Sequence, residues 1–235
     1  MPAEGIVSMA ALSASDMVVV VTGGDAVDPA HLLDLPDGAR VIAADSGVEH
    51  ALLLGLSVHR VVGDFDSASP TALAAASAAG ASLERHPAAK DATDLELALD
   101  AALELGARRI HVLGGHGGRL DHLLANLLLL ARPQHADVTV SAQMGAARVA
   151  VVRDTAMLRG PVGDLVTLLP IHGPARGVTT SGLLYPLAGE DLHDGTTRGV
   201  SNELIGDRAT VALTAGVLVA IQPGQLGTHH QETSR

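Results

Sequence analysis

The chain has 235 residues, of which 47% are hydrophobic, so it can bury one large core or two smaller ones. Its 15 basic and 26 acidic residues give a formal net charge of −11 with no basic block, which argues against a nucleic-acid partner or an anionic membrane surface. A nucleotide substrate stays open, because Mg²⁺ can bridge an acidic protein to an acidic phosphate. The absence of cysteine excludes disulfides, thiolate metal sites and a cysteine nucleophile.

The two ends of the chain carry no convincing targeting signal. Residues 1–16 lack the basic segment of a signal peptide, and the apolar run Met17–Val21 is far too short to cross a bilayer. We therefore expect a cytoplasmic protein that does not enter the membrane. Residues 1–16 are a candidate disordered N-terminus, and the polar residues 227–235 are expected to form a disordered tail.

From residue 17 to residue 144 the sequence alternates apolar strands with helices. The helices begin at N-cap and proline signals and end near glycines. Such alternation predicts an α/β domain with three layers, in which a mostly parallel sheet is covered by helices on both faces. The expected strands are Met17–Val21, Arg40–Ala44, Arg60–Val62, Ser82–Arg85, Arg109–Leu113 and Asp137–Ala142. The expected helices are a short one from Pro29, then Val48–Leu54, one from Pro70 to the stop at Gly80, Asp94–Leu105 and Leu120–Ala131.

The pattern changes near residue 145. Short β-rich runs follow one another, separated by Gly, Pro and Asp turns, without a strong helical pattern. This spacing predicts an antiparallel β-sandwich over residues 145–226. Its expected strands are Ala147–Arg153, Asp164–Leu169, Gly177–Thr180, Val200–Asn202, Ala209–Leu213 and Val217–Gln222.

Two carboxylates, Asp64 and Asp66, follow the third expected strand. Side chains two apart in extended backbone point the same way, so both would project from the carboxyl end of the strand, where ligands bind in open α/β sheets. Like charges held side by side favour a cation between them, and carboxylate oxygens select Mg²⁺ or Ca²⁺. A solvated Asx turn is the alternative, and the motif alone does not decide between the two.

Further candidates lie at the ends of neighbouring strands. Gly24 and Asp45 follow the first two strands, and Asp94 lies in the first turn of a helix, where it could become a third metal ligand. Each residue also has a plain structural interpretation. Asp45 would be a turn former, Asp94 a partner of the helix dipole, and Thr93 an ordinary N-cap.

A glycine-rich turn, Gly114–Gly118, follows the fifth expected strand. It has the spacing of neither the P-loop nor the dinucleotide fingerprint, yet its backbone N–H groups could cradle a phosphate. Arg119, a natural bidentate phosphate ligand, follows it, and Asp121 and His122 come next. His122 and Asn126 lie four apart on one helix face. The alternatives are a mere turn, a solvated arginine and an ordinary polar helix face.

These segments, taken together, resemble the thiamine pyrophosphokinase family. They occur in the family's order and at its spacing, and the resemblance extends from about Val18 to Gln222. Any one motif is weak, whereas five in register are specific. Ser46 departs from the pattern, since the family more often has a second glycine there. The matching segments are Ala44-Asp45-Ser46-Gly47, Gly63-Asp64-Phe65-Asp66-Ser67, Lys90-Asp91-x-Thr93-Asp94-Leu95-Glu96, Gly117-Gly118-Arg119-Leu120-Asp121-His122-x-x-x-Asn126, and Thr180-x-Gly182-Leu183-x-Tyr185-Pro186-Leu187 followed by Ser201-Asn202.

The resemblance implies an α/β ATP-binding domain, a β-sandwich that helps to hold thiamine, and a homodimer with active sites at the subunit interface. The reaction would transfer the pyrophosphoryl group of ATP to the thiamine hydroxyl, with Mg²⁺ required and AMP released. The resemblance assigns the site residues to three groups. Asp64, Asp66 and Asp94 would bind the metal and, with Asp121, form the catalytic set; Gly24, Asp45, Lys90, Thr93, Arg119, His122 and Asn126 would line the ATP site; Asp121, Tyr185, Ser201 and Asn202 would face thiamine.

The sequence offers few aromatic rings to stack on a pyrimidine. Tyr185 and Phe65 are the candidates, and each has a structural alternative, Phe65 in the core and Tyr185 as a plug of the sandwich. Three other functions therefore stay open. They are a diphosphokinase of another hydroxymethyl heterocycle such as a pterin, a nucleotide-binding sensor without turnover, and an α/β domain without an active site.

Overall fold

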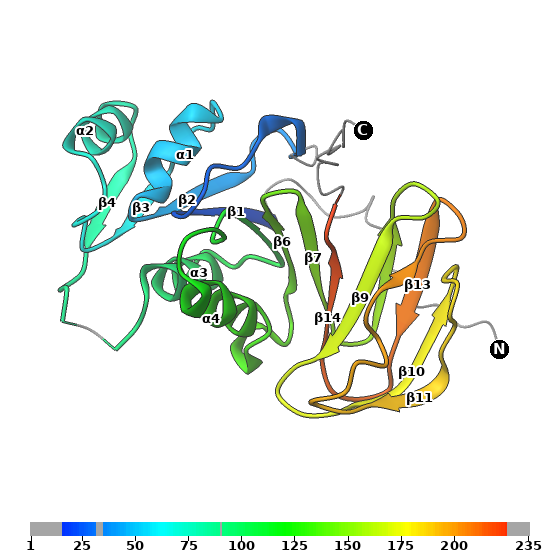
Figure 1. Ribbon diagram of the computed structural model, residues 1–235. Coiled ribbons are helices and arrows are strands. Elements are labelled where there is room, and N and C mark those ends of the chain that lie inside the picture. The colour runs from blue at the N-terminus through cyan, green and yellow to red at the C-terminus, as the bar shows by residue number, and fades with distance from the viewer. Residues whose placement is uncertain (1–15, 32–34, 90, 225–235) are drawn as a thin grey trace, which may run out of the picture.

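The computed structural model describes residues 16–31, 35–89 and 91–224. Within these ranges the chain forms a ten-stranded mixed sheet and a four-stranded antiparallel sheet (Figure 1). Apart from Asp16, the segments that the sequence predicts to be disordered, 1–16 and 227–235, lie outside the described residues.

The parallel part of the large sheet contains the six strands expected in the N-terminal half. The strand order of this sheet is β12-β9-β14-β7-β6-β5-β1-β2-β3-β4, and the strands from β6 to β4 in that order pair in parallel. The predicted α/β architecture is thereby confirmed. These strands are β1 (Met17–Thr22), β2 (Arg40–Ala44), β3 (Arg60–Gly63), β4 (Ser82–Arg85), β5 (Arg109–Leu113) and β6 (Thr139–Met144).

The α-helices of the described ranges cover the parallel strands, α1 and α2 on one face and α3 and α4 on the other (Figure 1). They are α1 (Gly47–Leu53), α2 (Pro70–Ala78), α3 (Asp94–Glu104) and α4 (Leu120–Leu130). The predicted caps are present: the Ser69 hydroxyl accepts the Ala72 N–H at 3.1 Å, and the Thr93 hydroxyl accepts the Glu96 N–H at 3.2 Å. The short helix expected from Pro29 is a 3₁₀ turn, Pro29–His31, within the described residues. No helix in these ranges is both long enough and apolar enough to cross a bilayer.

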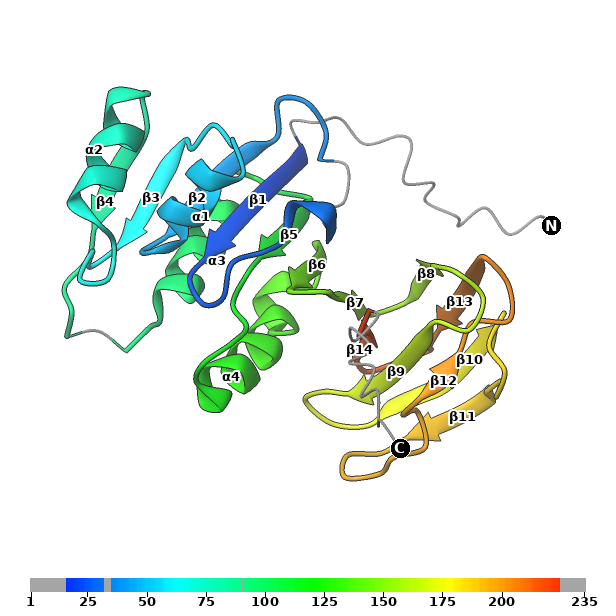
Figure 2. The ribbon, with the colours of Figure 1, turned by 45° about the horizontal axis from the view of Figure 1, so that its top comes forward.

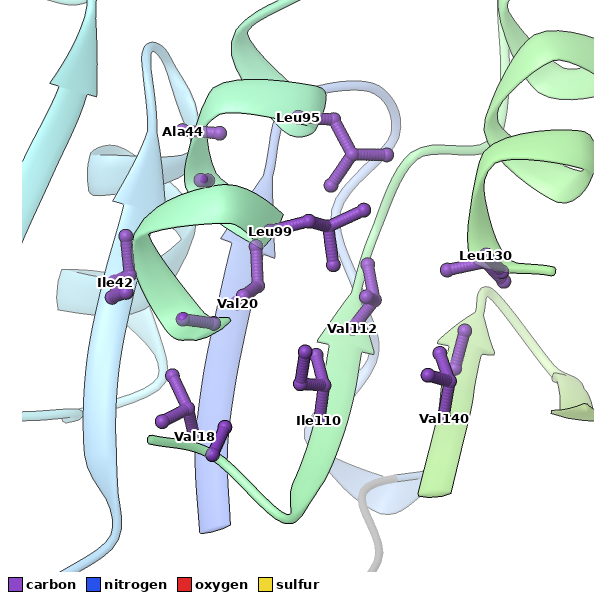
Figure 3. Packing of buried hydrophobic residues seen from close by; sticks show 14 of the residues in the cluster. Val18, Val20, Ile42, Ala44, Leu95, Leu99, Ile110, Val112, Leu130 and Val140 are labelled. Atoms are coloured by element: carbon purple, nitrogen blue, oxygen red, sulfur yellow. The ribbon is translucent and has the colours of Figure 1, made fainter. Parts of the chain in front are cut away.

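Alternate residues of each parallel strand enter opposite cores, because side chains of a strand alternate between its two faces. Val18 and Val20 of β1 pack with Leu95 and Leu99 of α3 (Figure 3). The intervening valines of β1 pack on the other face, with Val48 of α1. Burial on both faces explains why the strands of this half are continuous apolar runs in the sequence.

The C-terminal half forms the predicted β-sandwich. Figure 2 shows its second sheet facing the antiparallel end of the large sheet. The strands that extend the large sheet are β7 (Ala147–Val152), β9 (Leu165–Pro170), β12 (Asn202–Glu203) and β14 (Leu218–Gln222). The second sheet has the order β11-β10-β13-β8 and contains β8 (Thr155–Arg159), β10 (Ala175–Ser181), β11 (Ala188–Leu192) and β13 (Arg208–Ala212).

The sequence missed two strands, β8 and β11, which are the two edges of the second sheet. Only Leu158 of β8 and Leu192 of β11 are buried. An edge strand with a single buried side chain carries almost no hydrophobic periodicity, which is the signal that a sequence provides.

The large sheet continues from the α/β half into the sandwich. β6 and β7 pair antiparallel on either side of Gly145 and Ala146, so the backbone ladder passes the predicted boundary without a break. The division into residues 17–144 and 145–226 stays a prediction. The predicted boundary lies in the turn of this hairpin.

A buried histidine makes the stability of the fold depend on pH. His111 of β5 is 1% exposed; its Nδ1 lies 2.8 Å from the Ser141 hydroxyl, and its Nε2 has no hydrogen-bond partner among the described residues. Burial lowers the pKa of His111 to about 4, since the charged imidazole is disfavoured away from water.

We predict a loss of stability between pH 6.5 and pH 4. The unfolded chain takes up a proton on His111 near pH 6.5 and the folded chain only near pH 4, so acid favours unfolding by up to ~3 kcal/mol. Urea unfolding at pH 7.5 and pH 5 should show about 2 kcal/mol of this loss, because at pH 5 the folded chain is still mostly unprotonated at His111. The variant His111→Asn should show a smaller loss on acidification; an unchanged loss would contradict the assignment to His111.

Candidate active site

The strands that carry the predicted site residues of the first half end at one edge of the sheet. β1, β2, β3 and β5 are parallel, so their carboxyl ends lie at the same edge. β1 pairs with β2 on one side and with β5 on the other, and the loops after β1 and β5 therefore diverge. Such a switch point is where open α/β sheets bind their ligands.

Three carboxylates meet at the ends of β2 and β3. Asp45, Asp64 and Asp66 each place one oxygen within 4.8 Å of the others. The Ser67 hydroxyl donates to Asp45 Oδ2, whereas Asp45 Oδ1 is buried and has no hydrogen-bond partner in the described part of the chain. Asp45 is only 6% exposed, and a buried carboxylate oxygen without a donor is costly. A divalent cation between the three carboxylates would satisfy this oxygen, so the residues fit Mg²⁺ or Ca²⁺.

Asp94, the third metal ligand that the resemblance suggests, lies beside this group. Its Oδ1 is 3.1 Å from the position that a Cβ on Gly63 would occupy, and the Asp45 Cβ is equally close to that position. The absence of a side chain at Gly63 thus leaves room for both aspartates. The tightest cluster contains Asp45, which the resemblance assigns to the triphosphate, and the role of each aspartate stays a prediction.

Electrostatics at the cluster favour a cation. The pKa of Asp66 is raised above its ordinary value, first by the negative charge of Asp64, then by partial desolvation and by Asp45. A bound cation would relieve this repulsion.

The carboxylates of Asp64 and Asp66 meet for a reason that the sequence did not indicate. We expected extended backbone through both residues after the strand Arg60–Val62, but β3 ends at Gly63 and Phe65 has φ +64°. The backbone there is a left-handed turn, in which the Asp66 N–H donates to Asp64 Oδ1 at 3.1 Å, so the Asx turn considered as an alternative is also present. A left-handed Phe costs on the order of 1–2 kcal/mol. The Phe65 ring packs against the core under α1, as its structural interpretation predicts.

The glycine loops after β1 and β5 pack backbone against backbone. A Cβ on Gly24 would lie 2.3 Å from the His116 carbonyl oxygen, which accepts the Asp25 N–H at 2.8 Å. A Cβ on Gly117 would lie 2.1 Å from the Asp25 carboxyl carbon. Gly24 and Gly117 both have positive φ values, which favour glycine, and at Gly24 the close approach to the His116 main chain requires glycine as well.

The polar residues after the second glycine loop are held by contacts of their own. Arg119 and Asp121 form a two-pronged ion pair, with Nε–Oδ1 at 3.2 Å and Nη2–Oδ2 at 2.6 Å. This pairing lowers the pKa of Asp121 to about 2. The side-chain amide of Asn126 donates to the Gly115 carbonyl at 2.9 Å and so anchors the loop, while His122 is exposed. Arg119 lies at the start of α4 beside a shallow hollow of about 200 Å³, lined by Gly117, Gly118, Arg119, Leu120 and Leu123.

Of the residues assigned to thiamine, Asp121 lies in the first turn of α4, whereas Tyr185, Ser201 and Asn202 lie on the sandwich. Asn202 is 7% exposed, and its side chain accepts the Tyr185 N–H at 3.0 Å and donates to the Tyr185 carbonyl at 2.7 Å. Ser201 has φ +57° and donates its N–H to the Thr167 hydroxyl. Tyr185 is 58% exposed, so it does not plug the sandwich core.

One chain does not bring these two groups of residues together. Ser201 and Asn202 lie at β12, one edge of the ten-stranded sheet, whereas the acidic cluster follows β2 and β3 near the other edge. Lys90 lies outside the described residues. The sequence reasoning also gave no role to Ser67 or Arg85, which contact Asp45 and the Asp64 backbone respectively. Ser67 belongs to the motif Gly63–Ser67, so the sequence could have indicated it. No motif in the sequence around Arg85 indicates a functional role.

The comparisons with known proteins agree with these features. Two family models match the chain: "Thiamin pyrophosphokinase, catalytic domain" over residues 35–142 and "Thiamin pyrophosphokinase, vitamin B1 binding domain" over residues 156–218. The chain belongs to the thiamine pyrophosphokinase family. It is 29% identical over 191 residues to the thiamine pyrophosphokinase of Bacillus subtilis (strain 168), which covers 77% of this chain and 86% of that protein.

Solved structures of this family share the whole fold. The crystal structure of thiamine pyrophosphokinase from Bacillus subtilis has a TM-score of 0.78 and 27% identity, covering 89% of this chain and 100% of that one. The enzyme from Geobacillus thermodenitrificans has a TM-score of 0.75 and 28% identity, covering 90% and 99%. Thiamine pyrophosphokinase from Candida albicans, at 16% identity, shares the fold with a TM-score of 0.68 over 88% of each chain.

We predict that Asp64→Asn keeps the fold but loses at least ~100-fold in turnover, because one preorganised charged group of the cluster is removed. The rate of AMP formation from ATP and the thermal unfolding midpoint measure the two effects. Asp207→Asn, an exposed aspartate of the sandwich that is 78% accessible at its side chain, serves as the control. Near-normal turnover in Asp64→Asn would contradict a metal role for Asp64.

Proposed function

We propose that this chain transfers the pyrophosphoryl group of ATP to the hydroxyl of thiamine, giving thiamine diphosphate and AMP, with Mg²⁺ at the acidic cluster. The observation that carries the proposal is the group Asp45, Asp64 and Asp66, which includes a buried carboxylate oxygen without a hydrogen-bond partner among the described residues, in a chain of this family. The match to a vitamin B1 binding domain favours thiamine over a pterin as acceptor.

Catalysis of this reaction depends mainly on positioning the substrates and neutralising their charge. The thiamine oxygen attacks the β-phosphorus in line, the bond from that phosphorus to the α–β bridging oxygen breaks, and AMP departs with this oxygen while the hydroxyl proton is released. Mg²⁺ held by Asp45, Asp64 and Asp66, with Asp94 beside them, would neutralise phosphate charge and so let a hydroxyl approach a polyanion.

We place the triphosphate between the acidic cluster and the loops that follow β1 and β5. Four glycines of the turn Gly114–Gly118 lie at the switch point; of these, Gly118 has open space where a side chain would be, and Arg119 is the N-cap of the helix that follows. Arg119 would exchange part of its bond to Asp121 for phosphate oxygens, because guanidinium binds both anions in the same forked geometry. Lys90, Thr93, His122 and Asn126 keep the ATP-site roles that the family motifs suggest.

We further propose a homodimer in which each active site combines the acidic cluster of one copy with the sandwich of the other. The separation of β12 from β2 and β3 within one sheet supports this arrangement, since a single reaction needs ATP and thiamine in contact. In this proposal Asn202 acts through its bonds to the Tyr185 backbone, and Tyr185, Ser201 and Asp121 face thiamine. A cytoplasmic location stays an expectation from the sequence.

The experiment that tests the reaction is AMP formation from Mg²⁺-ATP with and without thiamine, with the product identified by mass. We expect AMP that depends on thiamine, together with thiamine diphosphate. A parallel reaction with a hydroxymethyl pterin should give no AMP above background. AMP formation only with the pterin, or ATP binding without any AMP, would contradict the proposal.

Mixing two inactive variants tests the shared site. Asp64→Asn removes the cluster and Asn202→Ala removes the support of Tyr185, so each homodimer should be inactive. Random exchange of subunits would give heterodimers with one intact site, and about a quarter of the wild-type activity should return. If the mixture shows no more activity than its two components, both groups of residues act within one chain.

A further inference from the structure

The aromatic residue between the two carboxylates holds a backbone conformation that bulky side chains rarely adopt. Phe65 has φ +64°, in the left-handed region. Because Phe65 connects Asp64 to Asp66, its backbone sets the direction of both carboxylates. Contacts from outside the turn must hold it in place, since the conformation is unfavourable for Phe itself.

Arg85, the last residue of β4, contacts this turn in two ways. Its Nη1 donates to the Asp64 carbonyl at 2.9 Å, and its Cζ lies 4.9 Å from the centroid of the Phe65 ring. The Arg85 backbone is itself fixed, because Arg85 pairs with Gly63 in the parallel ladder and the His86 N–H donates to the Gly63 carbonyl at 2.8 Å. The Arg85 side chain therefore contacts both the main chain of Asp64 and the ring of Phe65.

In this contact the guanidinium of Arg85 donates to a main-chain carbonyl, that of Asp64. Asp45, Asp64 and Asp66 each place one carboxylate oxygen within 4.8 Å of the others beside this contact. The arrangement thus keeps the acidic character of the site while fixing the turn that carries it.

We propose that Arg85 is a positioning residue of the metal site: it holds Phe65 in the left-handed conformation and, through Phe65, holds Asp64 and Asp66 in the arrangement that binds a divalent cation. The inference rests on the proposed function for the identity of the cation. It assigns a role to a residue that the sequence presents only as the end of a strand.

Binding of Mn²⁺, used as a spectroscopic probe for a hard divalent cation, tests the proposal without relying on turnover. Free Mn²⁺ is measured by electron paramagnetic resonance in titrations of each protein. We expect Arg85→Gln to weaken Mn²⁺ binding by roughly 10-fold, as supporting residues around metal ligands usually do. Arg85→Lys should recover part of the loss, because its ammonium donates to the same carbonyl but lacks the planar face.

Arg208→Gln is the matched control. Arg208 lies on β13 of the sandwich, is 61% exposed at its side chain and pairs with the neighbouring Asp207. The variant changes the net charge by the same amount as Arg85→Gln, and it should bind Mn²⁺ as the wild type does. If Arg85→Gln does not fold, the Mn²⁺ affinity of Arg85→Lys is compared with that of the wild type and of Arg208→Gln instead.

A double-mutant cycle with Phe65→Gly separates support of the turn from a general effect. Glycine adopts a positive φ without strain, so the turn of the Phe65→Gly variant no longer needs Arg85. Arg85→Gln should then weaken Mn²⁺ binding by less than about 3-fold in the Phe65→Gly background.

Two outcomes would overturn the proposal. One is Mn²⁺ binding by Arg85→Gln within about 2-fold of the wild type, and the other is an equal loss whether position 65 carries phenylalanine or glycine. Failure of the proposed function is a separate result. In that case the wild-type protein would make no thiamine-dependent AMP, and this result does not depend on the Mn²⁺ affinities of the variants.

Discussion

The mutual repulsion of Asp45, Asp64 and Asp66 is the constraint around which this end of the molecule is built. Three carboxylates remain together only if the backbone forces them together, and the parallel pairing of β2 and β3 does so. Gly63 leaves space where Asp45 and Asp94 approach, and the Ser67 hydroxyl donates to one oxygen of Asp45. The remaining repulsion is what a divalent cation would relieve. In the proposed function, the arrangement that costs the metal-free protein stability would also provide its affinity for a metal.

The continuous large sheet explains how two unlike halves serve one reaction. Its parallel part brings the loops after β1, β2, β3 and β5 to one edge, and its antiparallel part carries the sandwich. The hairpin of β6 and β7 joins the two rigidly through main-chain hydrogen bonds. A rigid connection fixes the distance between the acidic cluster and β12, so the two groups of residues cannot approach each other by bending of the chain between them. In the homodimer that we propose, a second copy of the chain would combine them.

Most of the fold could be predicted because buried strands and capped helices have strong local signals. The apolar runs of β1, β2 and β5, and the caps Ser69 and Thr93, stand in the structure where the sequence indicated them. The edge strands β8 and β11 could not be predicted, since half-exposed edges carry no periodicity. The site motifs were also recognisable in the sequence, because their spacing is a local property of the chain.

What the sequence determined by itself is therefore the order of elements, the family and the acidic character of the site. Only the tertiary structure decided which carboxylates meet, and it grouped Asp45 with Asp64 and Asp66. It also decided that Phe65 is left-handed and that Arg85 supports it. The reason is physical: such contacts join residues far apart in the sequence, and a left-handed turn without glycine is imposed by its surroundings rather than by its own residues.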